Sequence, residues 1–265
     1  MEILLPVIIL SLLGAIFGVG LAVASKKFEV KVDSRIEKIH GLLPGANCGA
    51  CGGAGCFGFA ESLIEGKLPL EACRVTSDYN RRAIAQILGI KIENTVRKTA
   101  LFHCNGGTKV KNKFIYEGIQ DCVAANSLMG GPKVCRFGCI GLGTCVRACP
   151  FGAISMSKEA LPVVNPQKCK ACNKCVTACP KKLFFLIPVI HTVYVACVSH
   201  DTGKDTKEAC PSGCIGCKLC EKTCKFDAIH VEENKAVISY HKCTSCKECV
   251  RVCPRKTIRV REESR

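Results

Sequence analysis

Three runs of cysteine at one fixed spacing constrain this chain more than any other feature of its sequence. Each run reads Cys-x2-Cys-x2-Cys-x3-Cys; Pro180 and Pro254 follow two of them, and Lys225 follows the third. A loop with this spacing wraps three thiolates around one face of a [4Fe-4S] cube, and its fourth cysteine reaches the second cube of a pair. The sequence therefore predicts that the cysteines of all three runs are ligands of cubane clusters. The runs are Cys169, Cys172, Cys175 and Cys179; Cys214, Cys217, Cys220 and Cys224; and Cys243, Cys246, Cys249 and Cys253.

A fourth run is incomplete. Cys139, Cys145 and Cys149 occupy the first, third and fourth ligand positions, but Leu142 stands at the second. Cys135 is the nearest substitute, and we favour it as the missing ligand. Crossed ligation of paired cubes then predicts four ligand sets: Cys135, Cys139, Cys145 and Cys179; Cys169, Cys172, Cys175 and Cys149; Cys214, Cys217, Cys220 and Cys253; and Cys243, Cys246, Cys249 and Cys224.

A separate group of four cysteines lies near the N-terminus, in a loop rich in glycine and alanine: Cys48, Cys51, Cys56 and Cys73. Small residues let backbone amides approach cluster sulfurs, and such hydrogen bonds tune the reduction potential. We therefore expect a fifth [4Fe-4S] cluster here. Four further cysteines remain, which could form a sixth cluster or simply lie buried: Cys104, Cys122, Cys197 and Cys210. Cys104 and Cys122 are also more distant candidates for the missing ligand of the incomplete run.

Zinc sites and disulfide bonds are the other ways in which a chain uses so many cysteines, here 24 of 265 residues. Paired Cys-x2-Cys units do bind structural zinc, but a four-cysteine run repeated three times at this spacing is typical of cubane clusters. Disulfides persist in oxidising compartments, whereas the membrane segment described below predicts a cytoplasmic location. The six histidines show no paired, ligand-like spacing. Cysteine-bound iron is the interpretation that the pattern favours.

The formal net charge of +16 would suggest a nucleic-acid partner if every cysteine were neutral. An oxidised cube with its four thiolates carries about −2, so five of them would lower the total to about +6. The remaining positive charge suits an acidic protein, and we expect a docking surface for ferredoxin at Lys109, Lys111, Lys113, Lys181 and Lys182. The sequence contains no glycine-rich dinucleotide fingerprint and no nucleophile–base arrangement. It predicts an electron carrier without catalytic residues of its own.

Residues 3–24 contain no charged side chain and are long enough to cross about 30 Å of hydrocarbon as a helix. A cleaved signal peptide is the alternative, but Glu2 is the only charge before the apolar run, so the basic segment of a signal peptide is missing. We therefore expect a retained, single-pass membrane anchor. Lys26 and Lys27 follow it directly, and the positive-inside rule then places the rest of the chain on the cytoplasmic side of the cell membrane.

The cysteine groups divide the chain into successive parts, and we expect an α+β protein. The parts are a transmembrane helix at 1–25, a four-cysteine domain at 26–95, a Gly- and Lys-rich connecting segment at 96–134, a first two-cluster ferredoxin module at 135–182, a connecting segment at 183–209 and a second ferredoxin module at 210–265. The modules repeat one another, and the residues around Cys104 and Cys197 repeat more weakly. Alternating apolar and polar residues predict a β-hairpin inside each module. Residues 80–90 form an amphipathic helical pattern.

The order of these parts resembles the B subunit of the Rnf complex, a family also called Rsx. The resemblance rests on one hydrophobic N-terminal segment, on the spacing Cys48-x2-Cys51-x4-Cys56-x16-Cys73 and on the tandem ferredoxin runs, and it covers nearly the whole chain. Two ferredoxin modules resemble the longer form of the family in anaerobic bacteria. The resemblance implies an ion-translocating ferredoxin:NAD oxidoreductase in which this subunit takes electrons from reduced ferredoxin, while another subunit handles the nicotinamide.

We therefore expect a membrane-anchored electron-transfer subunit of a translocase that couples NAD reduction to Na+ or H+ transport. Its expected partners are soluble ferredoxin, other membrane and flavin-bearing subunits, and lipid around residues 3–24, with no nucleic acid. Two other functions stay open. The chain could keep a redox-sensing iron–sulfur regulator reduced, or it could be the polyferredoxin subunit of a membrane hydrogenase. The proteins that co-purify with it would separate these possibilities.

Overall fold

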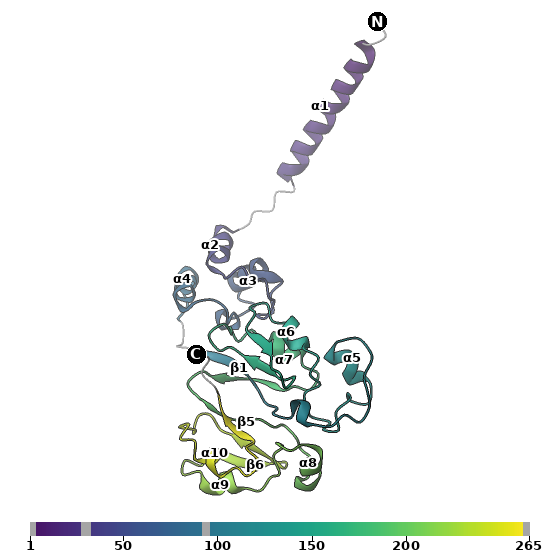
Figure 1. The fold of residues 1–265 in the computed structure, drawn as a ribbon. Coiled ribbons are helices and arrows are strands. Elements are labelled where there is room, and N and C mark those ends of the chain that lie inside the picture. Colours follow the sequence, from purple (N-terminus) through teal and green to yellow (C-terminus); the bar gives the residue numbers. More distant parts are fainter. Residues whose placement is uncertain (1–3, 28–32, 92–95, 262–265) are drawn as a thin grey trace.

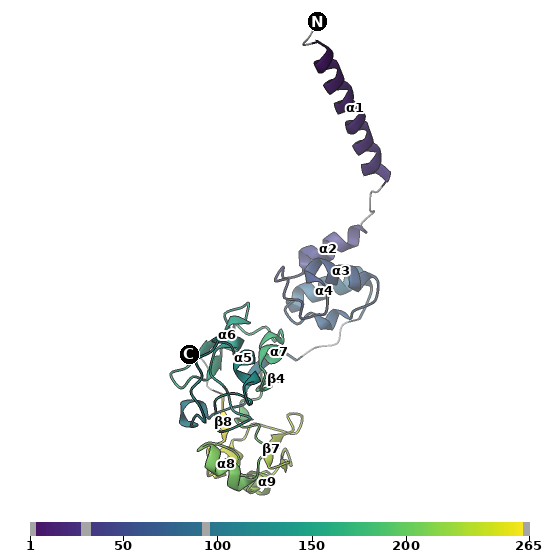
Figure 2. The same cartoon turned by 90° about the vertical axis from the view of Figure 1, so that its right-hand side faces the viewer.

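The computed structural model describes residues 4–27, 33–91 and 96–261. Parts of three expected segments lie outside these described residues: 1–3 in the membrane helix, 28–32 and 92–95 in the four-cysteine domain, and 262–265 in the second module. The described parts follow one another in sequence order, from the N-terminal helix at one end of the molecule to the second ferredoxin module at the other (Figures 1 and 2).

Helix α1 (Leu4–Lys27) stands apart from the other elements (Figure 1). Its large apolar side chains from Val7 to Val23 are exposed, with Leu10 at 71% and Leu21 at 72%. The stretch Val7–Lys27 is long and apolar enough to cross a membrane. Each Å² of apolar surface left in water costs about 25 cal/mol, so this helix gains free energy by burial in a medium such as lipid. It is a candidate membrane span.

The four-cysteine domain is a small helical unit with its own apolar core. Asp33 caps the first helix by accepting a hydrogen bond from the Arg35 amide, and Ser77 caps the last. Because of that cap, the helix expected at 80–90 begins earlier, at Asp78. Its last residue is Leu88, and the backbone of the following Gly89 has a left-handed conformation. Side chains of all three α-helices meet in the core. The elements are α2 (Ser34–Leu42), α3 (Gly55–Ile64), η1 (Leu70–Ala72) and α4 (Asp78–Leu88), and buried core residues include Ile39, Phe59, Leu70 and Ile84.

Each ferredoxin module contains the predicted hairpin, with one short helix at the third cysteine of each cysteine loop. The first hairpin pairs β2 (Ile154–Met156) with β3 (Pro162–Val164) in antiparallel register. The second pairs β6 (Ile229–Glu232) with β7 (Lys235–Ile238) in the same way. The hairpin predictions are therefore confirmed. The helices of the loops are α6 (Thr144–Arg147) and α7 (Lys174–Ala178) in the first module, and α9 (Leu219–Thr223) and α10 (Glu248–Val252) in the second.

The two segments expected to be connectors contribute strands to the modules. Strand β1 (Lys98–Phe102) pairs with β4 (Phe184–Pro188), and β5 (Val193–Val195) pairs with β8 (Ile258–Val260). These strands supply buried apolar side chains to the core of each module. The segments 96–134 and 183–209 therefore lie between cysteine motifs in the sequence, but in the fold they pack as parts of the modules. The remaining elements in these segments are η2 (Gly107–Lys109), α5 (Cys122–Ser127) and α8 (Gly203–Ala209).

Gly53 lies in the N-terminal cysteine loop where the backbone passes very close to α3. A Cβ at this position would lie 2.9 Å from backbone atoms of Phe59, and Phe59 is almost completely buried. We therefore expect Gly53→Ala to lower the free energy of unfolding by about 1–3 kcal/mol, because neither backbone can yield easily. The matched control is Gly41→Ala in α2, where no atom lies within 4 Å of an added Cβ. Thermal unfolding followed by circular dichroism tests this, and equal midpoints for the two variants would contradict it.

Candidate iron–sulfur centres

The four cysteines of the N-terminal domain line one cavity beside α3: Cys48, Cys51, Cys56 and Cys73. The side chain of Asn47 fixes the start of this helix, since its Oδ1 accepts a hydrogen bond of 2.7 Å from the Cys56 amide. The Thr76 hydroxyl donates to the Cys73 sulfur at 3.1 Å. Burial raises the pKa of the Cys51 thiol, and its neighbours Cys73 and Cys48 raise it further. The predicted set is thus brought together in space.

The second module brings together both crossed sets predicted for it. One cavity is lined by Cys214, Cys217 and Cys220 from one loop and by Cys253 from the other. Cys249 lies among the members of the second set. Burial raises its pKa to about 12, and nearby thiols raise it further, those of Cys243, Cys246 and Cys224 among them.

One set of the first module also follows the crossed pattern. Burial raises the pKa of the Cys175 thiol to about 12. The neighbouring thiols that raise it further are Cys169 and Cys172 from the same loop, and then Cys145 and Cys149 from the preceding run. Cys149, the fourth cysteine of that run, therefore lies near the first three of the next, in keeping with the crossed pattern.

The cysteine that the structure adds to the incomplete run is not the expected one. Its cavity is lined by Cys139, Cys145, Cys179 and Cys122, and Cys135 does not line it. Burial raises the pKa of Cys145 to about 11, and the largest thiol contributions come from Cys122 and Cys179. The structure therefore brings Cys122, and not Cys135, to the position that Leu142 leaves without a ligand. Cys135 lines a separate cavity with Cys104, Cys197 and Cys210, and Cys139 lines this cavity as well.

A polar clamp explains how Cys122 reaches a run that begins far along the chain. Asp121 caps α5 by accepting hydrogen bonds from the first amides of the helix, and it also accepts one of 2.8 Å from the Thr144 hydroxyl. The same hydroxyl accepts a hydrogen bond of 2.7 Å from the Cys122 amide. Arg147 adds a hydrogen bond to the carbonyl of Gln120. Helix α5 is thereby fixed against α6, with Cys122 beside Cys145.

Backbone amides point at the sulfurs in a repeated pattern. A first cysteine accepts a hydrogen bond from the amide two residues later, as Cys169 does from Ala171 at 3.5 Å and Cys243 from Ser245 at 3.4 Å. The fourth cysteine of every run accepts one at 3.3 to 3.5 Å from the amide four residues later: Cys149, Cys179, Cys224 and Cys253. Such donors stabilise negative charge on the sulfur and tune a bound cluster.

These cavities fit four-iron cubes in their donor sets. In the described residues no group of three or more His, Cys, Asp or Glu side chains is placed to hold a single metal ion. Three of the cavities are instead each lined by four cysteines, which is the ligand number of a [4Fe-4S] cube. Burial raises the pKa of several of these thiols, which favours their protonated form. Bound iron would supply the positive charge that holds them as thiolates.

A helical four-cysteine domain followed by two tandem ferredoxin modules defines an iron–sulfur protein of the electron-transport class. Family models match in the same places: a putative Fe-S cluster model at residues 43–75, and 4Fe-4S dicluster domain models at residues 137–183 and 213–258. The chain belongs to the family of B subunits of Rnf ion-translocating oxidoreductase complexes, as its similarity to curated members shows.

Three relatives carry this assignment. The chain is 45% identical to the B subunit of the Na+-translocating ferredoxin:NAD+ oxidoreductase complex of Acetobacterium woodii, over 91% of this chain and 73% of that protein. It is 41% identical to the B subunit of the ion-translocating oxidoreductase complex of Methanosarcina acetivorans, over 96% of each chain. It is 39% identical to the B subunit of the proton-translocating ferredoxin:NAD+ oxidoreductase complex of Clostridium ljungdahlii, over 92% of this chain and 86% of that protein.

Proposed function

We propose that this chain carries electrons from reduced ferredoxin to the membrane subunits of a complex that couples NAD reduction to Na+ or H+ transport. The names of two of its relatives describe complexes of this kind. When bound, each cube accepts and releases one electron. The protein contributes fixed positions for the cubes, amide donors that set their potentials, and a membrane helix that keeps the series beside its partners.

The observation that carries this proposal is an uninterrupted series of cysteine sets along the molecule. In each pair of neighbouring sets, burial raises the pKa of one thiol, and a thiol of the next set raises it further. From the second module toward the N-terminal domain, this further increase occurs at Cys249 from Cys220, at Cys197 from Cys214, at Cys139 from Cys104, at Cys175 from Cys145, and at Cys172 from Cys48. A series without gaps supports a relay across the whole chain.

The two ends of the series suggest its direction. Of the 24 cysteines, all described, two are exposed: Cys217 and Cys246 in the second module. Exposed Lys218 and Lys247 follow them directly. The N-terminal set lies at the other end of the series, in the domain that follows α1 in the chain (Figure 1). We therefore propose that ferredoxin docks on the second module and that electrons leave from the N-terminal domain, with the soluble part in the cytoplasm as Lys26 and Lys27 suggest.

The lysines first expected to bind ferredoxin are largely used inside the chain. Lys109 pairs with Glu159 at 3.1 Å. The Lys113 ammonium donates to the carbonyl of Met129, and the half-buried Lys181 donates to that of Gly130. Side chains committed in this way order loops of the first module. For this reason we move the proposed docking surface to Lys218 and Lys247.

Reversing the charge of this surface should slow electron entry. We expect the double variant Lys218→Glu and Lys247→Glu to take electrons from reduced ferredoxin about tenfold more slowly at low ionic strength, because steering by opposite charges is lost. The difference should shrink in high salt. Lys38→Glu on α2 is the matched control, since that lysine is also exposed but lies in the N-terminal domain. Anaerobic stopped-flow absorbance measures the rates; equal rates for all three proteins would contradict this docking surface.

The function itself is tested by gentle purification of the complete chain from its own membranes. We expect flavin-bearing integral subunits to co-purify and the assembly to reduce NAD with reduced ferredoxin. Recovery with a nickel protein or with a transcription regulator, and no such activity, would contradict the proposal.

A further inference from the structure

We propose that Cys104, Cys135, Cys197 and Cys210 hold a sixth [4Fe-4S] cluster between the two ferredoxin modules. The four side chains line one cavity, together with Cys139 of the neighbouring set, and no matched family model includes any of the four. The proposal does not depend on the identity of the electron donor or acceptor. It also accounts for the cysteine inventory, because 24 cysteines then form six sets of four with none left over.

The four residues occupy equivalent positions in the two halves of the internal repeat. Cys104 follows the end of β1 by two residues, and Cys197 follows the end of β5 by two residues. Cys135 precedes the first cysteine of its run by four residues, and so does Cys210. Each half therefore supplies one cysteine after a strand and one before a loop. Such a symmetric pairing is expected when two repeats share one site at their junction.

Two of the four sulfurs receive the same backbone hydrogen bonds as the predicted cluster ligands. The Gly106 amide donates to Cys104 at 3.5 Å, and the Ser199 amide donates to Cys197 at 3.4 Å. This is the two-residue pattern of Cys169 and Cys243. Amides aimed at Cys104 and Cys197 in this way favour a charged, ligating state of their sulfurs.

Val110, Ala196 and Val198 line part of the cavity, but a glycine and an unpaired histidine nitrogen lie there too. A Cβ at Gly106 would lie 2.7 Å from Val110 Cγ2, 3.5 Å from the Cys210 sulfur and 3.8 Å from the Cys104 sulfur. Glycine thus lets the backbone pass close to both sulfurs. His103 also lines the cavity, and its buried Nε2 has no hydrogen-bond partner in the described structure. Leaving a buried nitrogen unpaired costs free energy, so its presence beside four thiols points to a polar occupant.

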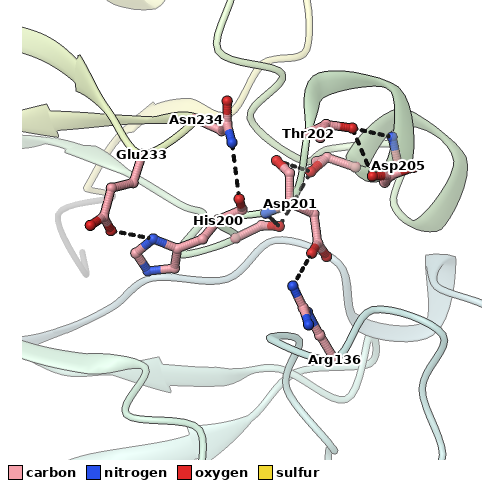
Figure 3. A network of polar contacts seen from close by, with 9 residues as sticks. Arg136, His200, Asp201, Thr202, Asp205, Glu233 and Asn234 are labelled. Atoms are coloured by element: carbon pink, nitrogen blue, oxygen red, sulfur yellow. Dashed lines mark hydrogen bonds and ion pairs between the residues drawn. The ribbon is translucent and has the colours of Figure 1, made fainter.

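Polar contacts between the modules hold the four cysteines in place. Arg136, the residue after Cys135, pairs with Asp201 in the loop that follows Cys197 (Figure 3). Arg259 donates to the side chain of Asn105, the residue after Cys104, at 2.6 Å. These bridges join the first module to the second next to the proposed ligands. The cluster would therefore also link the two halves of the relay, between Cys139 on one side and Cys214 on the other.

Iron and acid-labile sulfide analysis of the complete, anaerobically purified chain tests the site without any enzyme assay. We expect about 24 iron and 24 sulfide per chain, whereas about 20 of each would overturn the proposal. This measurement needs no variant, so it decides the question even if substitutions prevent folding.

Two double variants decide which cysteines share a site. Cys104→Ala and Cys135→Ala should each remove about four iron, and the two together should remove no more than either alone, because both break one cluster. Cys104→Ala with Cys122→Ala should remove about eight, because those residues belong to different sets. EPR of the reduced chains should show the matching loss of signal. Additive loss for Cys104 with Cys135, or joint loss for Cys104 with Cys122, would overturn the assignment.

Discussion

Cys253→Ala should expose the thiols of Cys214, Cys217 and Cys220, which lie in a different loop. In the structure these four cysteines line one cavity, although Cys253 belongs to the last run of the sequence. Loss of one ligand should therefore remove about four iron and four sulfide from that cavity. The cysteines of its own loop, Cys243 and its neighbours, should stay protected because Cys224 completes their set.

Alkylation of the native chain followed by peptide mass spectrometry reads this result directly. The matched variant is Cys224→Ala, which should give the opposite pattern and expose Cys243, Cys246 and Cys249. A finding that Cys253→Ala exposes the cysteines of its own loop would show that the runs are not crossed. Wild-type chain treated in the same way supplies the baseline.

The same substitution should also destabilise the second module strongly. Its apolar core is small and consists mainly of short aliphatic side chains, among them Val193, Ile229 and Ile258. Metal-binding free energy is folding free energy in such domains, so a lost cluster removes a large share of the stability. Because both loops meet at each cube, the second cluster should also become more labile.

Local spacing made most of the cysteine sets predictable. Ligands three residues apart in a tight loop face one cube, and the fourth ligand is fixed by the geometry of the pair, so no long-range information is needed. The hairpins were predictable for the same reason, since alternation and a turn define them. The N-terminal set also follows from its spacing. The structure brings each of these groups together as the sequence suggested.

The missing ligand of the incomplete run was not predictable from spacing. Cys135 is nearer along the chain, but Cys122 is brought in by the contacts of Asp121 and Thr144, which join α5 to α6. Hydrogen bonds between distant segments leave no periodic signal. One clue did exist: Cys210 holds the place of Cys135 in the second module, where the run is already complete. Because the second module has this cysteine although its run lacks no ligand, the equivalent Cys135 is not expected to replace the ligand that the first module lacks.

Cys48→Ala should nearly abolish electron transfer from this chain to the membrane subunits while leaving its reduction by ferredoxin intact. The Cys48 thiol lies close enough to Cys172 to raise its pKa further after the larger effect of burial. In this pair, a thiol of the N-terminal set lies near a thiol of the first module. The substitution takes one ligand from the N-terminal cavity and interrupts the series at that end. The remaining sets keep all their cysteines.

Anaerobic stopped-flow spectroscopy of the assembled complex separates the two steps, because bleaching of the visible absorption reports reduction and its recovery reports transfer onward. In Cys48→Ala we expect a normal bleach and almost no recovery, with about four iron fewer per chain. Glu71→Gln, at an exposed position of the same domain, is the control and should behave as wild type. Normal recovery in Cys48→Ala would show that electrons leave the chain elsewhere. Loss of the bleach would show that electrons enter through the N-terminal domain, because reduction of the chain would then require the N-terminal set.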